Sequence, residues 1–271
     1  MHTGHLSLVR ESSRNNDVSI ASIFVNPTQF GPNEDYSRYP RQLGRDVELL
    51  QELGVHHILA PATSATLYTP EHATTVSVKG FDQTAEGKAR PGHFSGVATV
   101  VTKLFNIVRP TTAYFGQKDA AQCVLIRRIV DDLNMDVNIV VHDTVREADG
   151  LALSSRNAYL TTTERTAAPV LYRALQAAQV LFAEFSSAAT TAKEDNSQPS
   201  NESDMIPAAE LVAVVRDVLR SEPLVSEIQY ISVDNPTTMQ PLQKVWRAKG
   251  AILSIACKVG SVRLIDNILL K

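Results

Sequence analysis

The sequence has few cysteines and no long apolar run, and these absences limit what the protein can be. Its 271 residues include only Cys123 and Cys257, each within an apolar stretch, so we expect buried, reduced thiols and a reducing compartment. No apolar run approaches the length that spans a bilayer. His2 and His5 stand where a secretory signal would need its apolar core. We therefore expect a cytoplasmic protein with no membrane partner.

The sequence also lacks an excess of one charge sign. Lys and Arg number 26 against 29 Asp and Glu, which gives a formal net charge of −3. Nucleic-acid partners usually require a basic excess, so none is expected, and any anion site must be local. Cys and His residues do not cluster at metal-ligand spacing, and neither a P-loop nor a serine nucleophile elbow is present. Hydrolysis by a Ser–His–Asp triad is therefore poorly supported.

Short apolar segments alternate with stretches of helical periodicity through the first half of the chain. The first of these segments, 18–24, is nearly all apolar and is expected to form a strand buried on both faces. Strands that alternate with helices indicate parallel βαβ units, so the predicted fold class is α/β with a doubly wound parallel sheet. The predicted strands are 18–24, 57–60, 113–115 and 137–141, and the predicted helices are 46–53, 97–108 and 120–133.

Beyond about residue 145 the pattern is that of a smaller α+β domain, so the expected domains are 1–144 and 145–271. Residues 186–204 are rich in Ser, Thr and Asn and nearly devoid of large apolar side chains. This composition indicates a disordered surface insertion without a catalytic role. Thr161 is the expected cap of the first helix of this domain. The predicted helices are 161–185 and 207–220, and the predicted strands are 228–233 and 251–259.

Polar motifs follow three of the predicted strands. Asn26 comes after the first strand, the segment 116–119 after another, and the segment 154–156 after the last strand of the first domain. Ligands of α/β sheets bind outside the carboxyl ends of the strands. We therefore expect these motifs to converge on one site.

Two histidines precede the first segment of helical periodicity. His2 and His5 would share a face at a helix start with free backbone N–H groups, which is an arrangement that binds anions. Gly4 between them would let a phosphate approach the backbone closely. Nearby histidines are more often ordinary surface or core residues, so this pattern is weak by itself.

The segment Phe115-Gly116-Gln117-Lys118-Asp119 is more informative. It has a strand, a glycine, and then a lysine and an acid at the start of a helix. Lysine supplies a compact charge for phosphate oxygens, and a carboxylate can accept hydrogen bonds from ribose hydroxyls. The alternative is a solvated turn in which Asp119 caps the following helix.

Three further motifs allow both a functional and an ordinary interpretation. The loop 153–157 combines hydroxyl donors with Arg156 and could grip a polyphosphate, or it could be a surface turn with a salt-bridged arginine. The segment 90–94 could bring positive charge to a cleft, or could form a rigid turn. The amides of Asn26, Gln29 and Gln122 could orient a hydroxy acid, although scattered amides are common.

Taken together, the motifs resemble one enzyme family over nearly the whole chain apart from 186–204. They occur in the order HTGHLSLV, SIFVNPTQF, YPR, RPGHFSGV, FGQKDAAQ, DGLALSSRN and RLIDN. The chain is thereby similar to the pantoate–β-alanine ligase (pantothenate synthetase) family of the His-x-Gly-His nucleotidyltransferase superfamily. No covalent enzyme nucleophile is required in that family, which agrees with the absence of one here.

The resemblance implies a fold, a reaction and partners. The fold would be a Rossmann-like ATP- and pantoate-binding domain (1–144) with a C-terminal lid domain (145–271), usually in a homodimer. The reaction would join pantoate to β-alanine at the expense of ATP through a pantoyl adenylate, releasing AMP and pyrophosphate. Mg²⁺ would accompany the ATP. This reaction belongs to pantothenate and coenzyme A biosynthesis.

The resemblance also implies roles for individual residues. His5 would be the proton donor, and His2, Lys118 and Arg156 would share the catalytic work; no metal ligand is assigned. The residues expected to bind pantoate and β-alanine are Asn26, Gln29, Gln122, Arg90 and His93. The residues expected to bind ATP are Met1, His2, Thr3, Gly4, His5, Gly116, Gln117, Lys118, Asp119, Val145, Leu153, Ser154, Ser155 and Arg156.

The sequence departs from the family at its start. In the family a helix, the first parallel strand and a Pro-Thr-Met-Gly-like loop precede the histidine motif, whereas Met1 directly precedes His2 here. The first strand of the sheet is thus apparently missing. Loss of a central strand would expose unpaired backbone groups, so we expect this chain alone to fold poorly or to be nearly inactive.

Two alternative functions stay open from the sequence. One is a different nucleotidyltransferase, which would stop at a stable nucleotidyl product instead of releasing AMP in a reaction that depends on both pantoate and β-alanine. The other is a non-catalytic nucleotide-binding or dimerisation subunit. The intact charges of His5, Lys118 and Arg156 argue against that second alternative.

Overall fold

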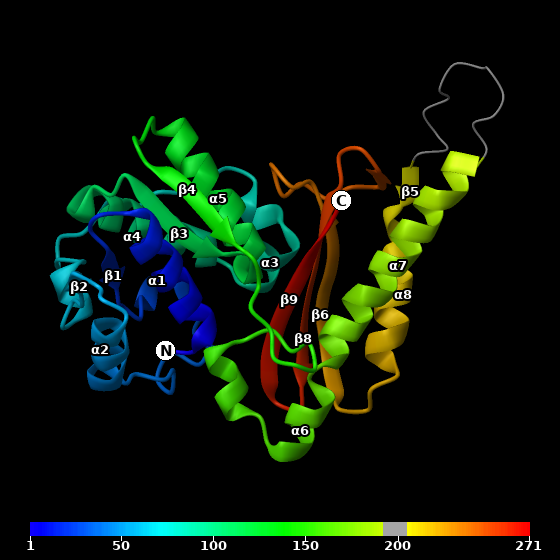
Figure 1. The fold of residues 1–271 in the computed structure, drawn as a ribbon, viewed down its shortest axis with the longest axis horizontal. Helices are drawn as coiled ribbons and strands as arrows, with labels where there is room; N and C mark the ends of the chain where they lie inside the picture. The colour runs from blue at the N-terminus through cyan, green and yellow to red at the C-terminus, as the bar shows by residue number, and fades with distance from the viewer. Residues whose placement is uncertain (192–204) are drawn as a thin grey trace. The chain divides into compact units, whose positions relative to one another are not determined.

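The computed structural model describes residues 1–191 and 205–271, which form two compact units (Figure 1). The N-terminal unit comprises Met1–Val145 and Leu153–Ser155, and the C-terminal unit comprises Arg146–Ala152 and Arg156–Lys271. The first is a mixed α/β unit with parallel strands, and the second contains an antiparallel sheet. The α/β class and the separate C-terminal sheet expected from the sequence are confirmed.

The helices and strands predicted for the N-terminal unit are present, with ends shifted by a few residues. Its strands are β1 (Ile20–Ser22), β2 (His57–Leu59), β3 (Thr112–Gly116) and β4 (Asn138–His142). Its α-helices are α1 (Thr3–Asn15), α2 (Leu43–Glu52), α3 (Ala85–Ala89), α4 (His93–Val108) and α5 (Ala120–Asp132). Its 3-10 helices are η1 (Pro27–Gln29), η2 (Ser64–Thr66), η3 (Phe81–Gln83) and η4 (Gln117–Asp119).

The parallel strands form two pairs. In one pair Ile20 of β1 lies opposite His57 of β2, and in the other Thr112 of β3 lies opposite Asn138 of β4. The prediction that the first strand is buried on both faces is wrong, because Val18 is 55% exposed and Ile20 is 43% exposed. Within the described ranges β1 has a single neighbouring strand, so it does not take the central position that would bury both of its faces. A single doubly wound sheet stays a prediction.

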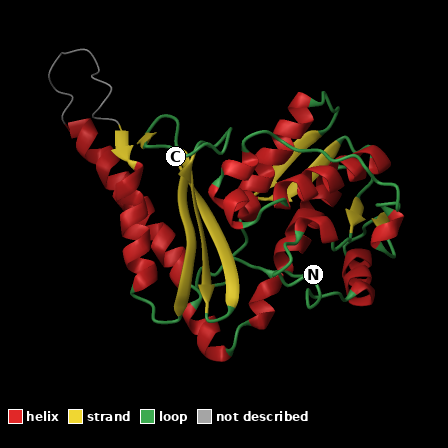
Figure 2. Ribbon diagram, turned by 180° about the vertical axis from the view of Figure 1, so that it is seen from behind, coloured by secondary structure: helices red, strands yellow, loops and turns green. Residues whose placement is uncertain are grey.

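The C-terminal unit places two long helices beside a three-stranded sheet. Helices α7 and α8 lie along the sheet formed by β6, β8 and β9 (Figure 2). Its helices are η5 (Ser155–Tyr159, beginning at the boundary), α6 (Thr162–Ala167), α7 (Val170–Thr191) and α8 (Ala208–Arg220). Its strands are β5 (Met205–Pro207), β6 (Val225–Asp234), β7 (Lys244–Trp246), β8 (Ala251–Val259) and β9 (Val262–Leu270).

The prediction of one continuous helix at 161–185 is wrong, because the structure has two helices there. Helix α6 ends before Pro169 and α7 begins after it, because proline lacks the N–H that would continue the helix and its ring clashes with the preceding turn. The cap is confirmed, since Thr161 Oγ1 accepts from the Glu164 N–H at 3.3 Å. Helix α7 continues to Thr191, into the segment expected to be disordered. The rest of that predicted insertion, 192–204, lies outside the described residues.

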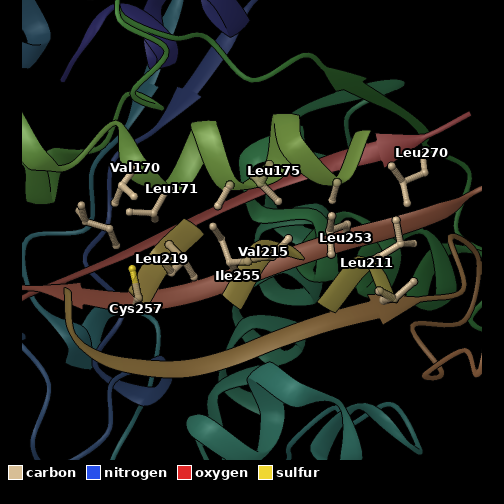
Figure 3. Packing of buried hydrophobic residues seen from close by; sticks show 14 of the residues in the cluster. Val170, Leu171, Leu175, Leu211, Val215, Leu219, Leu253, Ile255, Cys257 and Leu270 are labelled. Carbon is tan, nitrogen blue, oxygen red and sulfur yellow. The ribbon is translucent and has the colours of Figure 1, made fainter. Parts of the chain in front are cut away.

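The C-terminal unit has one continuous apolar core. Side chains of α7 and α8, among them Leu175, Leu211 and Leu219, pack with Leu253 and Ile255 of β8, all 0% exposed (Figure 3). Full burial of such a side chain is worth roughly 1.5–3 kcal/mol, so this cluster is a major source of stability for the unit.

Two expectations from the sequence concern buried thiols and membrane spans. Cys123 and Cys257 are both buried and unpaired, which confirms the first. Burial raises the pKa of each thiol to about 12, so both stay protonated at neutral pH. Across residues 1–191 and 205–271, no helix combines the length and the apolar character needed to cross a bilayer.

Candidate active site

The two histidines lie together at the start of α1. His2 is the N-cap residue and His5 stands in the first turn. Their rings stack with centroids 3.8 Å apart, and the His2 backbone N–H points at His5 Nδ1 at 3.5 Å. A helix brings residues three apart onto one face, which explains the stacking. The pair therefore stands beside the unpaired N–H groups of a helix N-terminus, where an anion is favoured.

Both rings are held in the neutral form at neutral pH. Burial, the neighbouring His5 and the Lys118 ammonium lower the pKa of His2 to about 4. Desolvation by surrounding protein atoms and the N-terminal amine lower the pKa of His5, against an opposing effect of Asp119, although this side chain stays accessible to solvent. His2 Nδ1 is buried without a hydrogen-bond partner in the part of the chain that the structure describes.

The motif after β3 carries the charges that act on these histidines. Strand β3 ends at Gly116, η4 holds Lys118 and Asp119, and α5 begins at Ala120. The Lys118 Nζ lies 3.8 Å from Asp119 Oδ1. The capping alternative is not supported, because Asp119 occupies the N-cap position of α5 without a side-chain cap hydrogen bond. The Asp119 carboxylate instead acts on the two histidines, whose pKa values it raises against the larger lowering effects.

A hydrogen bond and packing fix the position of this motif. The Cys123 thiol donates to the Gly116 carbonyl oxygen at 3.3 Å, which ties the end of β3 to α5. Helix α1 packs against β3. Gln122 lies half-buried in the first turn of α5. The histidine helix and the Lys118 turn are thus parts of one arrangement in the N-terminal unit.

Asn26 is the centre of a second polar cluster. It is 2% exposed, and its Oδ1 accepts from the Tyr68 hydroxyl and the Thr28 hydroxyl, each at 3.0 Å. Its Nδ2 donates to Gln29 Oε1 at 3.3 Å and to the Gly96 carbonyl oxygen at 3.2 Å. Asn26 thereby joins η1, which carries Gln29, to helix α4.

Gly96 is a site residue that the sequence analysis missed. A Cβ at this position would lie 2.4 Å from the Thr28 carbonyl oxygen and 2.8 Å from the Gln29 nitrogen. Any side chain would therefore push η1 away from α4. A glycine inside a helical pattern is a signal of such close packing, and it was visible in the RPGHFSGV segment. Tyr68 was missed as well, and no local pattern marks it.

Arg90 and His93 lie in a buried charged cluster. Arg90 forms a two-pronged pair with Glu34, with Nε and Nη2 each 2.7 Å from a carboxylate oxygen, and reaches Glu86 at 3.4 Å. Burial alone would lower the pKa of Arg90, but the hydrogen bonds and charges of the two glutamates outweigh it and raise that pKa. His93 Nδ1 lies 2.8 Å from the Gln29 carbonyl oxygen. This cluster therefore also touches the backbone of η1.

The loop with the two serines is held by a hairpin. The Leu153 N–H donates to the Val145 carbonyl oxygen at 3.0 Å, and a Cβ on Gly4 would lie 3.6 Å from Leu153 Cβ. Ser154 follows in the same unit, and Arg156 belongs to the C-terminal unit. The structure thus brings Leu153 to the histidine motif of the N-terminal unit.

The C-terminal RLIDN segment explains how the base of this hairpin is fixed. Asp266, 3% exposed, accepts two hydrogen bonds from Arg146, at 2.6 and 2.9 Å. The Arg146 guanidinium also lies 4.1 Å from the centroid of the Tyr172 ring. Gly150 has φ of 92°, and a Cβ there would lie 2.1 Å from the Tyr172 ring. Arg146 and Asp266 were not among the predicted site residues, although both lie within or beside segments that carried the resemblance.

Of the predicted site residues, the structure brings two sets together in the N-terminal unit. The first contains His2, Gly4, His5, Lys118, Asp119 and Leu153, and the second contains Asn26, Gln29, Arg90 and His93. Met1 pairs with Asp46 through its amino group, and Thr3 is exposed on α1. Gln117 stands in η4, and Ser155 begins η5.

These features define a mixed α/β ligand-binding protein in which a neutral histidine pair at a helix N-terminus faces a lysine turn. A family model described as pantoate-beta-alanine ligase matches residues 1–269. A protein named pantothenate synthetase from Chloroflexus aurantiacus is 50% identical over 271 residues, which cover all of this chain and 89% of that protein. The chain belongs to the pantoate–β-alanine ligase family.

Solved structures agree with this assignment. The pantothenate synthetase of Thermus thermophilus is 43% identical with a TM-score of 0.86, over 100% of this chain and 90% of that one. The pantoate-beta-alanine ligase of Francisella tularensis, complexed with beta-gamma ATP and β-alanine, is 34% identical with a TM-score of 0.72. The match covers 99% of this chain and 85% of that chain. The comparisons support an enzyme of this ligase family and give no support to a non-catalytic subunit.

Proposed function

We propose that the protein condenses pantoate with β-alanine at the expense of ATP, through a pantoyl adenylate, and releases AMP and pyrophosphate. The observation that carries the proposal is the stacked His2–His5 pair at the start of α1, acted on by the charge of Lys118. Membership of the ligase family and the ATP and β-alanine bound to the Francisella relative support it. This reaction belongs to pantothenate and coenzyme A biosynthesis.

In the first step a carboxylate oxygen of pantoate attacks the α-phosphorus of ATP. The bond from that phosphorus to the bridging oxygen of the β-phosphate breaks, and pyrophosphate leaves with the electron pair. Negative charge grows on the phosphate oxygens, where the Lys118 ammonium, the N–H groups of α1 and Arg156 would stabilise it.

Neutral histidines suit this step. Imidazole N–H groups can donate hydrogen bonds to the phosphates, and an approaching triphosphate would raise the pKa of both rings because it favours their charged form. The largest cause of the low pKa of His2 and of His5 is desolvation, which a bound anion would offset. His5 would then donate a proton to the departing pyrophosphate, with His2 and the N–H groups of Thr3 and Gly4 beside it.

In the second step the amine of β-alanine attacks the acyl carbon of the mixed anhydride. The bond between that carbon and the phosphate-linked oxygen breaks, an amide forms, and AMP departs with the oxygen that came from pantoate. The amine proton is released to solvent or to a nearby base. We assign pantoate and β-alanine to Gln29 and Gln122, because amides can hold a hydroxy acid without adding charge. Asn26, whose amide oxygen and nitrogen each already have two partners in the protein, would hold Gln29 in place.

Mg²⁺ enters the proposal as part of the nucleotide substrate. Among the residues that the structure describes, no three His, Cys, Asp or Glu side chains gather into a group that could hold a metal ion. Mg²⁺ often binds through one or two carboxylates together with substrate phosphates, and Asp119 beside Lys118 fits that pattern. The metal would neutralise triphosphate charge when bound.

Further parts of the proposal concern the whole molecule. We assign a Rossmann-like ATP and pantoate domain to residues 1–144, because polar motifs follow the ends of β1 and β3 there. We assign a lid domain to residues 145–271, and on the family resemblance we assign Ser154, Ser155 and Arg156 to the phosphates and Val145 to the adenine. The homodimer rests on the family resemblance and the cytoplasmic location on the sequence, and sedimentation and fractionation test them.

An isotope experiment tests the reaction and its intermediate together. Pantoate labelled with ¹⁸O in its carboxylate is incubated with ATP, Mg²⁺ and β-alanine, and the AMP is examined by mass spectrometry. One ¹⁸O in the phosphate of AMP is expected, because that oxygen forms the anhydride bond. AMP without the label, while pantothenate is formed, would exclude the pantoyl adenylate.

A further inference from the structure

The backbone carbonyl of Gln29 is held by two side chains outside η1. His93 Nδ1 lies 2.8 Å from this oxygen, and Arg90 Nη2 lies 3.3 Å from it. His93 is 8% exposed, so these contacts lie away from bulk water. Both residues come from the segment that ends α3 and begins α4.

The contacts of His93 determine which ring nitrogen carries its proton. A carbonyl oxygen can only accept a hydrogen bond, so Nδ1 must donate to the Gln29 oxygen. The other nitrogen, Nε2, lies 2.8 Å from Arg90 Nη1, and a guanidinium can only donate. Nε2 must therefore be unprotonated, and His93 is the neutral tautomer with its proton on Nδ1.

The N–H groups of Arg90 all have partners within the protein. Nε and Nη2 bind Glu34, Nη2 also binds the Gln29 oxygen, and Nη1 binds Glu86 and His93 Nε2. A guanidinium has five N–H groups, so none is left over for a substrate. Glu34 and Glu86 fix the orientation of the guanidinium, and the guanidinium fixes the His93 ring.

The other side of η1 is fixed as well. Asn26 Nδ2 donates to Gln29 Oε1 at 3.3 Å, and Gly96 leaves no room for η1 to move towards α4. Gln29 is thus held at its carbonyl by Arg90 and His93 and at its side chain by Asn26. The position of its amide depends on all these contacts.

We propose that His93 is a positioning residue for pantoate binding: held by Arg90 as the neutral Nδ1–H tautomer, it fixes the backbone of Gln29. The proposal rests on the assignment of pantoate to Gln29 above. In this proposal Arg90 and His93 do not contact the substrate. They act on substrate binding through η1, because they hold its residue Gln29 in place.

Acid should break the hydrogen bond between His93 and Arg90. A second proton on His93 would have to bind Nε2, which would place an N–H against the N–H of Arg90 and break their hydrogen bond. Burial and the Arg90 charge lower the pKa of His93 below its usual value, against the opposing effects of Glu86, the Gln29 carbonyl and Glu34. The ring therefore stays neutral at physiological pH, and pantoate binding should weaken only in acid.

The tautomer can be measured without turnover. Long-range ¹H–¹⁵N correlation spectra of the ¹⁵N-labelled protein distinguish a protonated Nδ1 from a protonated Nε2, and the His93→Asn variant identifies the signal among the seven histidines. We expect a protonated Nδ1 and an unprotonated Nε2 at neutral pH. A ring with its proton on Nε2, or with two protons, would overturn the proposal. If His93→Asn does not fold, His93→Gln gives the same assignment.

Kinetics of two variants test the positioning role. His93→Asn keeps an N–H close to the position of Nδ1, whereas His93→Leu removes it. His93→Leu should raise the KM for pantoate about tenfold with a smaller change in kcat, and His93→Asn should recover most of that loss. The KM for ATP, measured with the same proteins, should change by less than about twofold in both.

The pH profile adds a result that a purely structural role would not give. For the unchanged protein, kcat/KM for pantoate should fall in acid with the pKa that the His93 ring shows by NMR, and His93→Asn should lose that component. Equal effects of His93→Leu on pantoate and ATP, or an unchanged profile in His93→Asn, would overturn the proposal. No AMP release by the unchanged protein would instead contradict the proposed function itself.

Discussion

Both units bury apolar side chains, as Leu125 and Ile126 of α5 show for the N-terminal unit, but most of the candidate site lies in the N-terminal unit. The C-terminal unit has a continuous apolar core in which Leu211, Leu253 and Ile255 are 0% exposed. In the N-terminal unit, helix α1 has no buried residue and the parallel strands form two separate pairs within the described ranges. Its site depends on polar contacts such as those of Asn26 and Arg90.

We therefore expect that different residues determine the stability of the protein and the reaction that it catalyses. Apolar packing is non-directional and tolerates small changes of position, whereas hydrogen bonds fix a side chain only at a particular distance and angle. Substitutions in the C-terminal core should therefore lower the free energy of unfolding with little effect on the reaction of the folded protein. Substitutions in the N-terminal site should lower activity more than stability. Four substitutions test this contrast.

The largest effect is expected for Leu253→Ala in the C-terminal core. Removing a fully buried leucine side chain costs about 2–5 kcal/mol of unfolding free energy, because transfer energy is lost and a cavity forms. Urea denaturation measures the loss, with Val180→Ala, 55% exposed on α7, as the matched control. AMP formation by the folded fraction should be unchanged. A stable Leu253→Ala protein that has lost its activity would break the separation of roles.

Lys118→Met should have the next largest effect, and this effect should be on the reaction rate instead of on stability. Removal of one charged donor to the developing negative charge lowers kcat by about 10²–10³-fold. The side chain is only partly buried, at 18% exposed, so the unfolding midpoint should change little. Lys79→Met, an exposed lysine of the same unit, should keep its activity. A Lys118→Met rate within about twofold of the unchanged protein would remove Lys118 from the mechanism.

Gly96→Ala tests how tightly η1 is held. The new methyl group would lie 2.4 Å from the Thr28 carbonyl oxygen, so η1 and Gln29 must move. A shift of about 1 Å in a positioning group can cost about 10²-fold in kcat/KM, which we expect for pantoate in steady-state assays.

Gly44→Ala is the matched control for Gly96→Ala. Gly44 also stands in a helix, but a Cβ there has no neighbour within 4 Å. Alanine should stabilise α2 by about 0.5–1 kcal/mol and leave KM unchanged. Equal KM values in the two variants would show that η1 does not position pantoate.

The smallest effect is expected for Asp234→Asn, a buried polar position in the C-terminal unit. Burial raises the pKa of Asp234 from 3.8 to about 6, against a hydrogen bond from Ser232. Because the folded-state pKa is the higher one, this group stabilises the fold below pH 3.8, and the stabilisation is lost as the pH rises through about 6.

The substitution should therefore stabilise the protein above that range. Asparagine avoids the buried charge, so Asp234→Asn should add about 1–2 kcal/mol near pH 8 and nothing below about pH 4. Urea midpoints across this pH range measure the difference. The exposed Asp217→Asn control should shift stability by at most about 0.5 kcal/mol at any pH. A pH-independent effect of Asp234→Asn would contradict the account.

Local patterns predicted most of the elements. Apolar spacing placed α5 close to its observed Ala120–Asp132, and the apolar run 251–259 gave β8. The pattern did not show β9, because Arg263, Asp266 and Asn267 interrupt its apolar residues. It also joined α6 to α7, where Pro169 separates them. The spacing of apolar residues therefore predicts an element correctly where burial of one face or of the whole segment determines its sequence.

The site could be predicted only in part. His2, Lys118 and Gln29 were predicted as site residues because their types and positions matched motifs, yet their contacts come from distant parts of the chain. Arg90 reaches Glu34 across 56 residues and the Gln29 carbonyl across 61. No local pattern contains such pairings. They depend on how η1 and α4 pack, which the sequence alone does not specify at this level.

The most direct test of the account is AMP formation from ATP and Mg²⁺ by protein shown to be folded by circular dichroism. AMP should appear only when pantoate and β-alanine are both present, and pantothenate should form in equal amount. The dependence of AMP release on both substrates, and not the rate of release, identifies the reaction. A stable nucleotidyl product without AMP release, or no nucleotide turnover with either substrate, would contradict the account.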